Sequence, residues 1–214
     1  MSSASAMSRP FEQGVSGASA LSACRLSRFA GSLVEISGSG ASGTLSTAMA
    51  LVAEAQRREG EVGLTAWVAS TRSLFFPPDA VRTGVCLDRL ILLRLSAPAA
   101  QIGAATRLMQ SGAFGLVVVD LAGAPRSAPA LAGVSRLAGL TRRHRSALVV
   151  LTEKTAAAPS FDPRVMQRID ASRRGNRIVV TVVKDKGAAG ALRRRPLPPG
   201  SRFGREYREP AGMC

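Results

Sequence analysis

The chain has 214 residues, 46% of them hydrophobic, which is enough for one α/β domain with a buried core and too little for two. Its 29 lysines and arginines against 14 acidic residues give a formal net charge of +15, which favours polyanionic partners such as DNA, RNA or acidic protein surfaces, although a solubility charge in an arginine-rich proteome would look the same. No apolar run reaches the roughly 18 residues needed to span a bilayer, and the first residues lack the regions of a secretion signal, so we expect a cytoplasmic protein that does not bind a membrane.

Residues 1–30 are rich in Ser, Ala and Gly, and we expect them to form a flexible arm. They contain Cys24, the first of three cysteines; Cys86 and Cys214 lie far from it and from each other. This spacing matches neither a zinc site nor a disulfide framework, so we expect ordinary core or surface thiols, no metal and no cofactor.

Residues 31–186 are predicted to form the core domain, because strand patterns alternate there with helix patterns. The expected elements, in chain order, are a strand at 33–36, a helix at 44–59, strands at 64–69 and 89–95, a helix that Ser96 caps and Gly112 ends, a strand at 116–120, a helix at 130–145 and a strand at 147–152. Such alternation predicts an α/β fold with a mostly parallel sheet flanked by helices. The continuous apolar run Leu90–Leu93 predicts a strand that is buried on both faces.

Two further strands, at 165–171 and 177–183, flank the turn Arg173-Arg174-Gly175-Asn176 and predict a C-terminal antiparallel hairpin. Residues 187–214 are rich in Pro, Gly and Arg, which is typical of a tail, free or docked on the core.

The loop between the first strand and the first helix has the glycine spacing of a phosphate-binding P-loop, G-x-x-x-x-G-K-[ST]. Gly38 and Gly43 stand at the glycine positions, whereas Thr44 replaces the lysine and Leu45 replaces the magnesium ligand. Each lost charge-assisted contact removes about 1.5–3 kcal/mol, so we expect at most weak anion binding by the loop backbone and no efficient ATP hydrolysis. A Gly/Ser-rich turn without a ligand is the alternative. The degenerate loop comprises Gly38, Ser39, Gly40, Ala41, Ser42, Gly43, Thr44 and Leu45.

Asp120 ends the apolar strand at 116–120, where a Walker B aspartate would stand, although a residue that merely caps or turns the chain is common at such a position. Farther along, the strand at 177–183 leads into Lys184 and Lys186, which alternate and are therefore expected to face one side.

In their order and spacing, the strand and loop at 31–43, the strand ending in Asp120 and the strand ending in Lys184 and Lys186 resemble the core of the RecA ATPase. The resemblance implies a RecA-like fold. It also places Thr71 where the catalytic glutamate would stand, which implies that the general base is missing.

The loops that bind DNA in that family look shortened, and together with the segment 73–85 they resemble the ImuA group of RecA-like proteins. This resemblance implies a noncatalytic accessory protein of the DNA-damage (SOS) response and of mutagenic translesion synthesis. Its expected partners are RecA, an ImuB-like Y-family protein and an error-prone polymerase, with Lys184 and Lys186 as candidate contacts to a RecA protomer or, alternatively, a solvated strand end. A DNA-dependent ATPase with a rebuilt site and a SulA-like cell-division inhibitor are the competing hypotheses.

Much of the positive charge gathers between residues 172 and 208, which predicts weak, nonspecific binding to DNA phosphates. A merely solvated tail is the alternative. The candidate residues are Arg173, Arg174, Arg193, Arg194, Arg195, Arg202 and Arg205.

Overall fold

The computed structural model describes residues 26–40, 42–57, 64–124, 133–175 and 177–187, and the backbone of the strand 204–208. In this part of the chain, eight strands form one sheet in the order β3-β2-β4-β5-β1-β6-β7-β8. The strands are β1 (Leu33–Gly38), β2 (Leu64–Ser70), β3 (Leu90–Leu95), β4 (Phe114–Asp120), β5 (Ala147–Glu153), β6 (Gln167–Arg174), β7 (Arg177–Asp185) and β8 (Gly204–Arg208). The pairs from β3 through β6 are all parallel, while β7 runs antiparallel to both β6 and β8.

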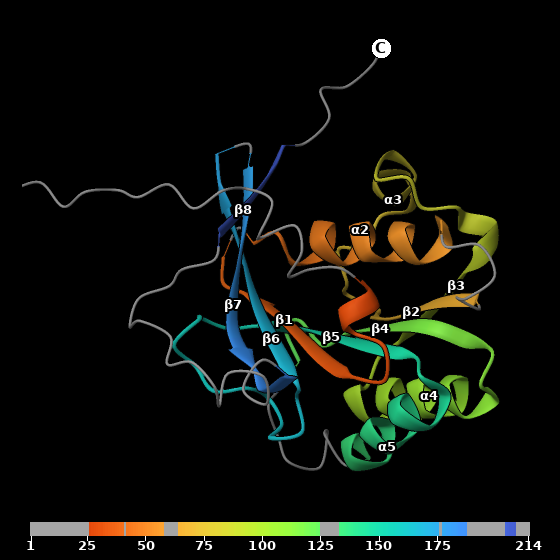
Figure 1. Cartoon of the computed structure of the whole chain (residues 1–214). Coiled ribbons are helices and arrows are strands. Elements are labelled where there is room, and N and C mark those ends of the chain that lie inside the picture. Colours follow the sequence, from red (N-terminus) through yellow and green to blue (C-terminus); the bar gives the residue numbers. More distant parts are fainter. Residues whose placement is uncertain are drawn as a thin grey trace, which may run out of the picture.

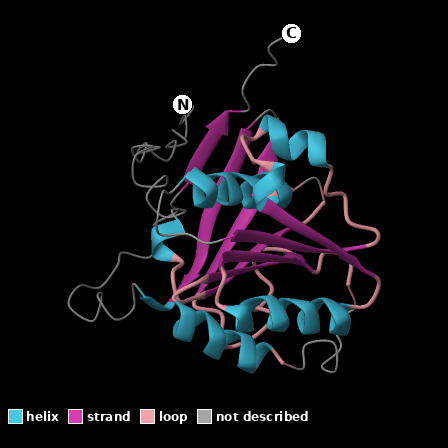
Figure 2. Ribbon diagram, turned by 90° about the vertical axis from the view of Figure 1, so that its right-hand side faces the viewer, coloured by secondary structure: helices cyan, strands magenta, loops and turns pink. Residues whose placement is uncertain are grey.

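Helices cover both faces of the sheet and make three layers (Figures 1 and 2). They are α2 (Thr44–Arg57), α3 (Pro77–Arg82), α4 (Pro98–Ser111) and α5 (Val134–His144), with the short 3-10 turns η1 (Leu26–Arg28) and η2 (Leu87–Arg89). One apolar core lies between the sheet and η1, α2 and α3, and a second lies between the sheet and α4 and α5. The predicted α/β class, the mostly parallel sheet with flanking helices and the C-terminal hairpin are thereby confirmed. No helix in the described ranges is long and apolar enough to cross a membrane.

Residues beyond both predicted boundaries of the core domain, 31 and 186, also pack against or pair with it. Leu26 and Phe29, from the segment expected to be an arm, are buried in the first core, whereas residues 1–25 lie outside the described part. Within the predicted tail, Gly204–Arg208 pairs with β7 as the edge strand β8.

Two local predictions about the strand and helix at 89–112 were wrong. The predicted buried strand is β3, which lies at the edge of the sheet and leaves Ile91 39% exposed, because β2 pairs with it on one side only. The helix that follows begins at Pro98 with Ala97 as its N-cap, and it has no side-chain cap, so Ser96 does not fill that role. Gly112 does end it, in the left-handed conformation that glycine adopts without strain.

The connection from β5 to β6 crosses the sheet without a helix. Because β1 lies between these two strands, residues 154–166 must pass over it, and they do so as a coil of turns and bends. We call this segment the crossing coil. It packs on the face of β1 that carries Leu33 and Glu35, the face that α5 also covers.

Candidate functional site: a cleft at the carboxyl ends of the strands

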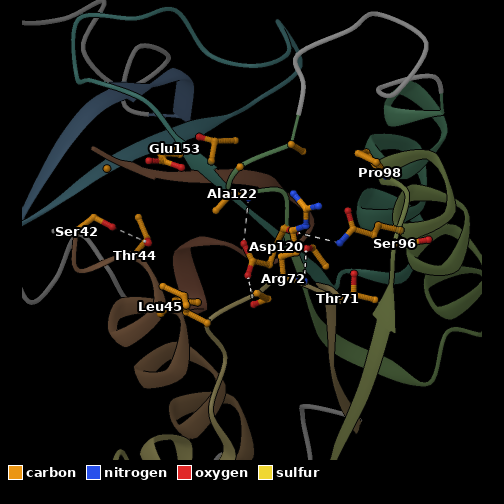
Figure 3. A pocket seen from close by; sticks show the side chains of 18 of the residues that line it. Ser42, Thr44, Leu45, Thr71, Arg72, Ser96, Pro98, Asp120, Ala122 and Glu153 are labelled. Atoms are coloured by element: carbon orange, nitrogen blue, oxygen red, sulfur yellow. Dashed lines mark hydrogen bonds between the residues drawn. The ribbon is translucent and has the colours of Figure 1, made fainter. Parts of the chain in front are cut away.

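A cleft of about 850 Å³ opens where the carboxyl ends of the first five strands meet. In open α/β sheets, ligands bind at this edge, because the loops that follow parallel strands converge there. The degenerate P-loop lies on one side of the cleft and the start of α4 on the other, with Asp120 between them (Figure 3). The sequence therefore predicted the P-loop and Asp120, and the structure brings them to one cavity.

The loop after β1 is tied to the hairpin beside it. The Gly43 N–H donates to the carbonyl of Ala171 over 3.0 Å, and Ser42 forms an antiparallel bridge with Ser172. A backbone donor that would face a phosphate in a working P-loop is thus used within the sheet.

Packing accounts for both glycines of the motif. A Cβ on Gly38 would lie 2.5 Å from Cβ of Ser42 and 2.7 Å from the Ala171 carbonyl oxygen, and a Cβ on Gly43 would lie 2.4 Å from Cγ2 of Ile178. Neither side chain could be added without a shift of β6 or β7, so the glycine spacing has a structural cause that needs no ligand.

The two positions that would carry charge and metal are neutral. Thr44, the first residue of α2, is buried, and its Oγ1 is 3.0 Å from Oγ of Ser42. Leu45 is partly buried and packs against the first core. Neither offers the ammonium group or the magnesium ligand on which phosphoryl transfer depends.

Asp120 lies on the floor of the cleft and is 2% exposed. Its Oδ2 accepts a short hydrogen bond from the Ser73 hydroxyl, and its Oδ1 accepts one from the Ala122 N–H at 3.1 Å. Burial raises the pKa of Asp120 above that of an ordinary carboxyl group, and these two hydrogen bonds offset part of that rise. The sequence predicted the position of this carboxylate but not its partner Ser73.

The charge balance of the cleft disfavours a polyphosphate. Arg72 is the one cation among the lining residues that the structure describes, and it shares the cleft with Asp120 and Glu153. Thr71, at the place of the expected glutamate, is exposed and carries no carboxylate. A triphosphate would meet more negative charge than positive here. Within the described ranges, no group of three or more His, Cys, Asp or Glu is placed to hold a metal ion.

Lys184 and Lys186 lie on the opposite side from the cleft, at the amino-terminal ends of the parallel strands, where β7 ends beside the beginning of β6. Their ammonium groups face the crossing coil: Lys184 donates to Oγ of Ser160 at 3.3 Å, and Lys186 donates to the carbonyl of Pro163. Burial and the neighbouring charge of Lys186 lower the pKa of Lys184. Both lysines do face one side, as predicted, and both hold a segment of this same chain.

The predicted DNA-binding arginines are spread over separate places. Arg173 and Arg174 are exposed at the tip of the β6–β7 hairpin, beyond the P-loop. Arg205 belongs to the backbone of β8, opposite Val180. The remaining candidates lie outside the described residues: Arg193, Arg194, Arg195 and Arg202.

A buried ionic network was missed from the sequence. Glu35, fully buried in β1, forms an ion pair with Lys154 Nζ, accepts hydrogen bonds from the Thr152 hydroxyl at 2.7 Å and the Phe161 N–H at 3.1 Å, and lies 4.0 Å from Nε of Arg168. The signal was present in Glu35, since a carboxylate in an apolar strand must find partners when it is buried.

No protein-family model matches this chain, and no significant match was found among curated proteins. A functional proposal therefore depends on the chemistry of the site and on the resemblance noted in the sequence.

Proposed function

We propose that this protein is a noncatalytic, RecA-like accessory protein of DNA-damage tolerance and induced mutagenesis, which binds RecA or an ImuB–polymerase complex and damps recombination by RecA. One observation carries the proposal. The cleft stands where a RecA-like ATPase would hold nucleotide, yet Thr44, Leu45 and Thr71 supply neither cation, metal ligand nor base, and Gly38 and Gly43 are there for packing.

The two ends of the parallel strands suggest how such a protein would act. The P-loop lies at their carboxyl ends, and Lys184 and Lys186 lie at their amino-terminal ends. In the RecA-like resemblance these are the two surfaces through which neighbouring protomers meet. A protomer that binds a filament end and lacks hydrolysis would stay there and stop growth, so substoichiometric amounts would suffice.

RecA-driven DNA strand exchange tests this route. We expect the wild type to inhibit exchange and the pair Lys184→Ala/Lys186→Ala to lose most of that inhibition. The charge-conserving pair Lys184→Arg/Lys186→Arg is the matched control and should retain inhibition, which separates loss of contact from loosening of the crossing coil. Absence of inhibition by the wild type at equimolar amounts would contradict the proposal.

Competition for DNA through the tail is the other way to inhibit exchange. The variant to use is the triple Arg193→Ala/Arg194→Ala/Arg195→Ala, not a truncation at Lys186. A truncation would also remove β8 and bare the edge of β7. If the arginine triple abolishes inhibition and the lysine pair does not, filament capping is wrong.

An ATPase with a rebuilt site is the second candidate, and the place of Asp120 on the floor of the cleft favours it. Under our proposal, magnesium-dependent ATP turnover with single-stranded DNA stays at the level of a buffer blank. Turnover that Asp120→Asn abolishes and the exposed-site control Asp79→Asn preserves would overturn the noncatalytic assignment.

A further inference from the structure

Four segments meet side by side at the amino-terminal edge of the sheet, opposite the cleft. Backbone hydrogen bonds of 2.9 Å join them in a row, from Gly31 N–H to Ser146 O, from Met166 N–H to Leu33 O and from Lys186 N–H to Met166 O. The row brings together the end of α5, the start of β1, the start of β6 and the end of β7. Since paired strands lie about 4.8 Å apart, it is about 14 Å long.

The exposed side chains along this row are mainly cationic. They come from η1, from the last turn of α5, from the crossing coil and from the end of β7. Together with the partly buried Lys184 they form what we call the cationic edge: Arg28, Arg142, Arg143, Arg145, Arg164, Lys184 and Lys186.

Few acids offset this charge. Asp185 pairs with Arg28 at 3.3 Å and Asp162 pairs with Arg164 at 3.2 Å. In the described part of the chain, no carboxylate forms an ion pair with the α5 arginines Arg142, Arg143 and Arg145. Arg142 and Arg143 lie in the last turn of α5 and Arg145 is its C-cap. The negative end of the helix dipole therefore stabilises each of their positive charges, by about 0.3–1 kcal/mol. The edge therefore keeps a net positive charge.

The composition of the edge fits phosphates better than a lipid surface. Five of its seven cations are arginines, whose guanidinium groups bind phosphate oxygens in pairs. A membrane-binding surface needs several exposed apolar anchors. Beside the cationic edge, the described residues offer Val183, which is 39% exposed, whereas the exposed aromatic Phe76 follows the carboxyl end of β2, at the opposite end of the strands. A nucleic-acid duplex carries, on each strand, one phosphate per about 3.4 Å of helix axis, so a row of this length laid along the axis spans roughly four phosphates of one strand.

We propose that the cationic edge is a binding surface for the phosphate backbone of DNA, built into the folded core and separate from the basic tail and the hairpin tip. This inference rests on the proposed function in one respect: the proposed function makes DNA the polyanion that the protein encounters. Binding there should be independent of sequence, because contacts to phosphates carry no information about the bases. It would orient the protein with the edge on DNA and the cleft facing outward.

Titration of a fluorescently labelled DNA duplex at increasing salt tests this surface. We expect Arg142→Gln/Arg143→Gln/Arg145→Gln to bind about tenfold more weakly and to lower the salt slope by about 3, since each phosphate contact contributes about 0.9 to that slope. The matched control is Arg82→Gln/Arg107→Gln/Arg136→Gln, which removes the same charge from exposed positions on α3, α4 and α5. It should keep the affinity close to wild type.

Equal losses in the two triples would mean that bulk charge, and not this edge, binds DNA, and would overturn the inference. Unchanged DNA binding by the α5 triple would overturn it as well. The same holds if the α5 triple keeps its binding to DNA and loses only its binding to vesicles of phosphatidylcholine and phosphatidylserine. Thermal melting followed by the fluorescence of the buried Trp67 confirms that each variant is folded. A RecA pull-down separates the two proposals: if the α5 triple still captures RecA but not DNA, the edge is a DNA site, and if wild type captures no RecA, only the proposed function fails.

Discussion

Replacing Glu35 by alanine is expected to lower the free energy of unfolding by about 3–5 kcal/mol, because it leaves buried cations without their counter-charge. Lys154 and Arg168 are 6% and 1% exposed, so water cannot replace the lost carboxylate. Urea denaturation followed by Trp67 fluorescence measures the change, and Trp67 suits this use because it is the one tryptophan of the chain and is fully buried.

The effect should be large because the network also holds the crossing coil. The ammonium group of Lys154 donates to the carbonyl of Pro159 at 2.7 Å, and the guanidinium of Arg168 donates to the carbonyls of Thr155 and Ala158. Glu35 thus neutralises the cations that bind this coil, which has no helix or strand of its own. Loss of the carboxylate should loosen the coil before the rest of the sheet, as increased hydrogen exchange over 155–161 would reveal.

Two controls sharpen this experiment. Asp88→Ala removes a carboxylate from an exposed position, and it should change the unfolding free energy by no more than about 0.5 kcal/mol. The double variant Glu35→Leu/Lys154→Met removes both members of the closest ion pair and should recover part of the stability, because apolar replacement of a buried pair is often neutral. A loss below about 1 kcal/mol for Glu35→Ala would show that the network does not carry this stability.

Substitution of Gly43 by alanine is expected to destabilise the fold by about 1–3 kcal/mol, the usual effect of overpacking a core. The added Cβ would lie 2.4 Å from Cγ2 and 3.0 Å from Cγ1 of Ile178, a buried side chain of β7. Ile178→Ala removes both of these atoms. In a double-mutant cycle monitored by urea denaturation, the two substitutions should therefore couple favourably by about 1 kcal/mol or more.

Gly103→Ala is the matched control, because nothing lies within 4 Å of the added Cβ in the middle of α4. It should stabilise the protein by up to about 1 kcal/mol, since alanine favours a helix over glycine. If Gly43→Ala left stability unchanged but altered binding of phosphate or nucleotide, the glycine would serve a ligand, and the packing explanation would be wrong.

The sequence by itself determined the class of the fold and much of its local structure. Apolar runs separated by helical patterns specify strands that alternate with helices, and short connections between them favour a parallel sheet with helices on both faces. Turn residues fixed some boundaries: Gly112 ends α4, and the glycine in Arg173-Arg174-Gly175-Asn176 closes the β6–β7 hairpin with a positive φ of 58°. These features depend on residues close together in the chain, so a sequence pattern records them.

The location of the cleft could also be predicted. Gly38 and Asp120 each end an apolar strand, and parallel strands present their carboxyl ends on the same side of the sheet. Most of the reason for the glycines could not be predicted, because, apart from Ser42 beside Gly38, the closest atoms that exclude a side chain belong to Ala171 and Ile178, more than a hundred residues away.

Only the tertiary structure decided which residues are edges, partners and surfaces. The run Leu90–Leu93 reads as a buried strand, and the order of strands puts it at the open edge of the sheet. Glu35 finds its partners only because the crossing coil passes over β1, and Lys184 of β7 is held by that same coil. The cationic edge gathers arginines from η1, α5 and the coil that no spacing rule connects. Pairing between segments far apart in the chain creates these juxtapositions. Its energy depends on contacts that are non-local in the sequence, which no short pattern of residues records.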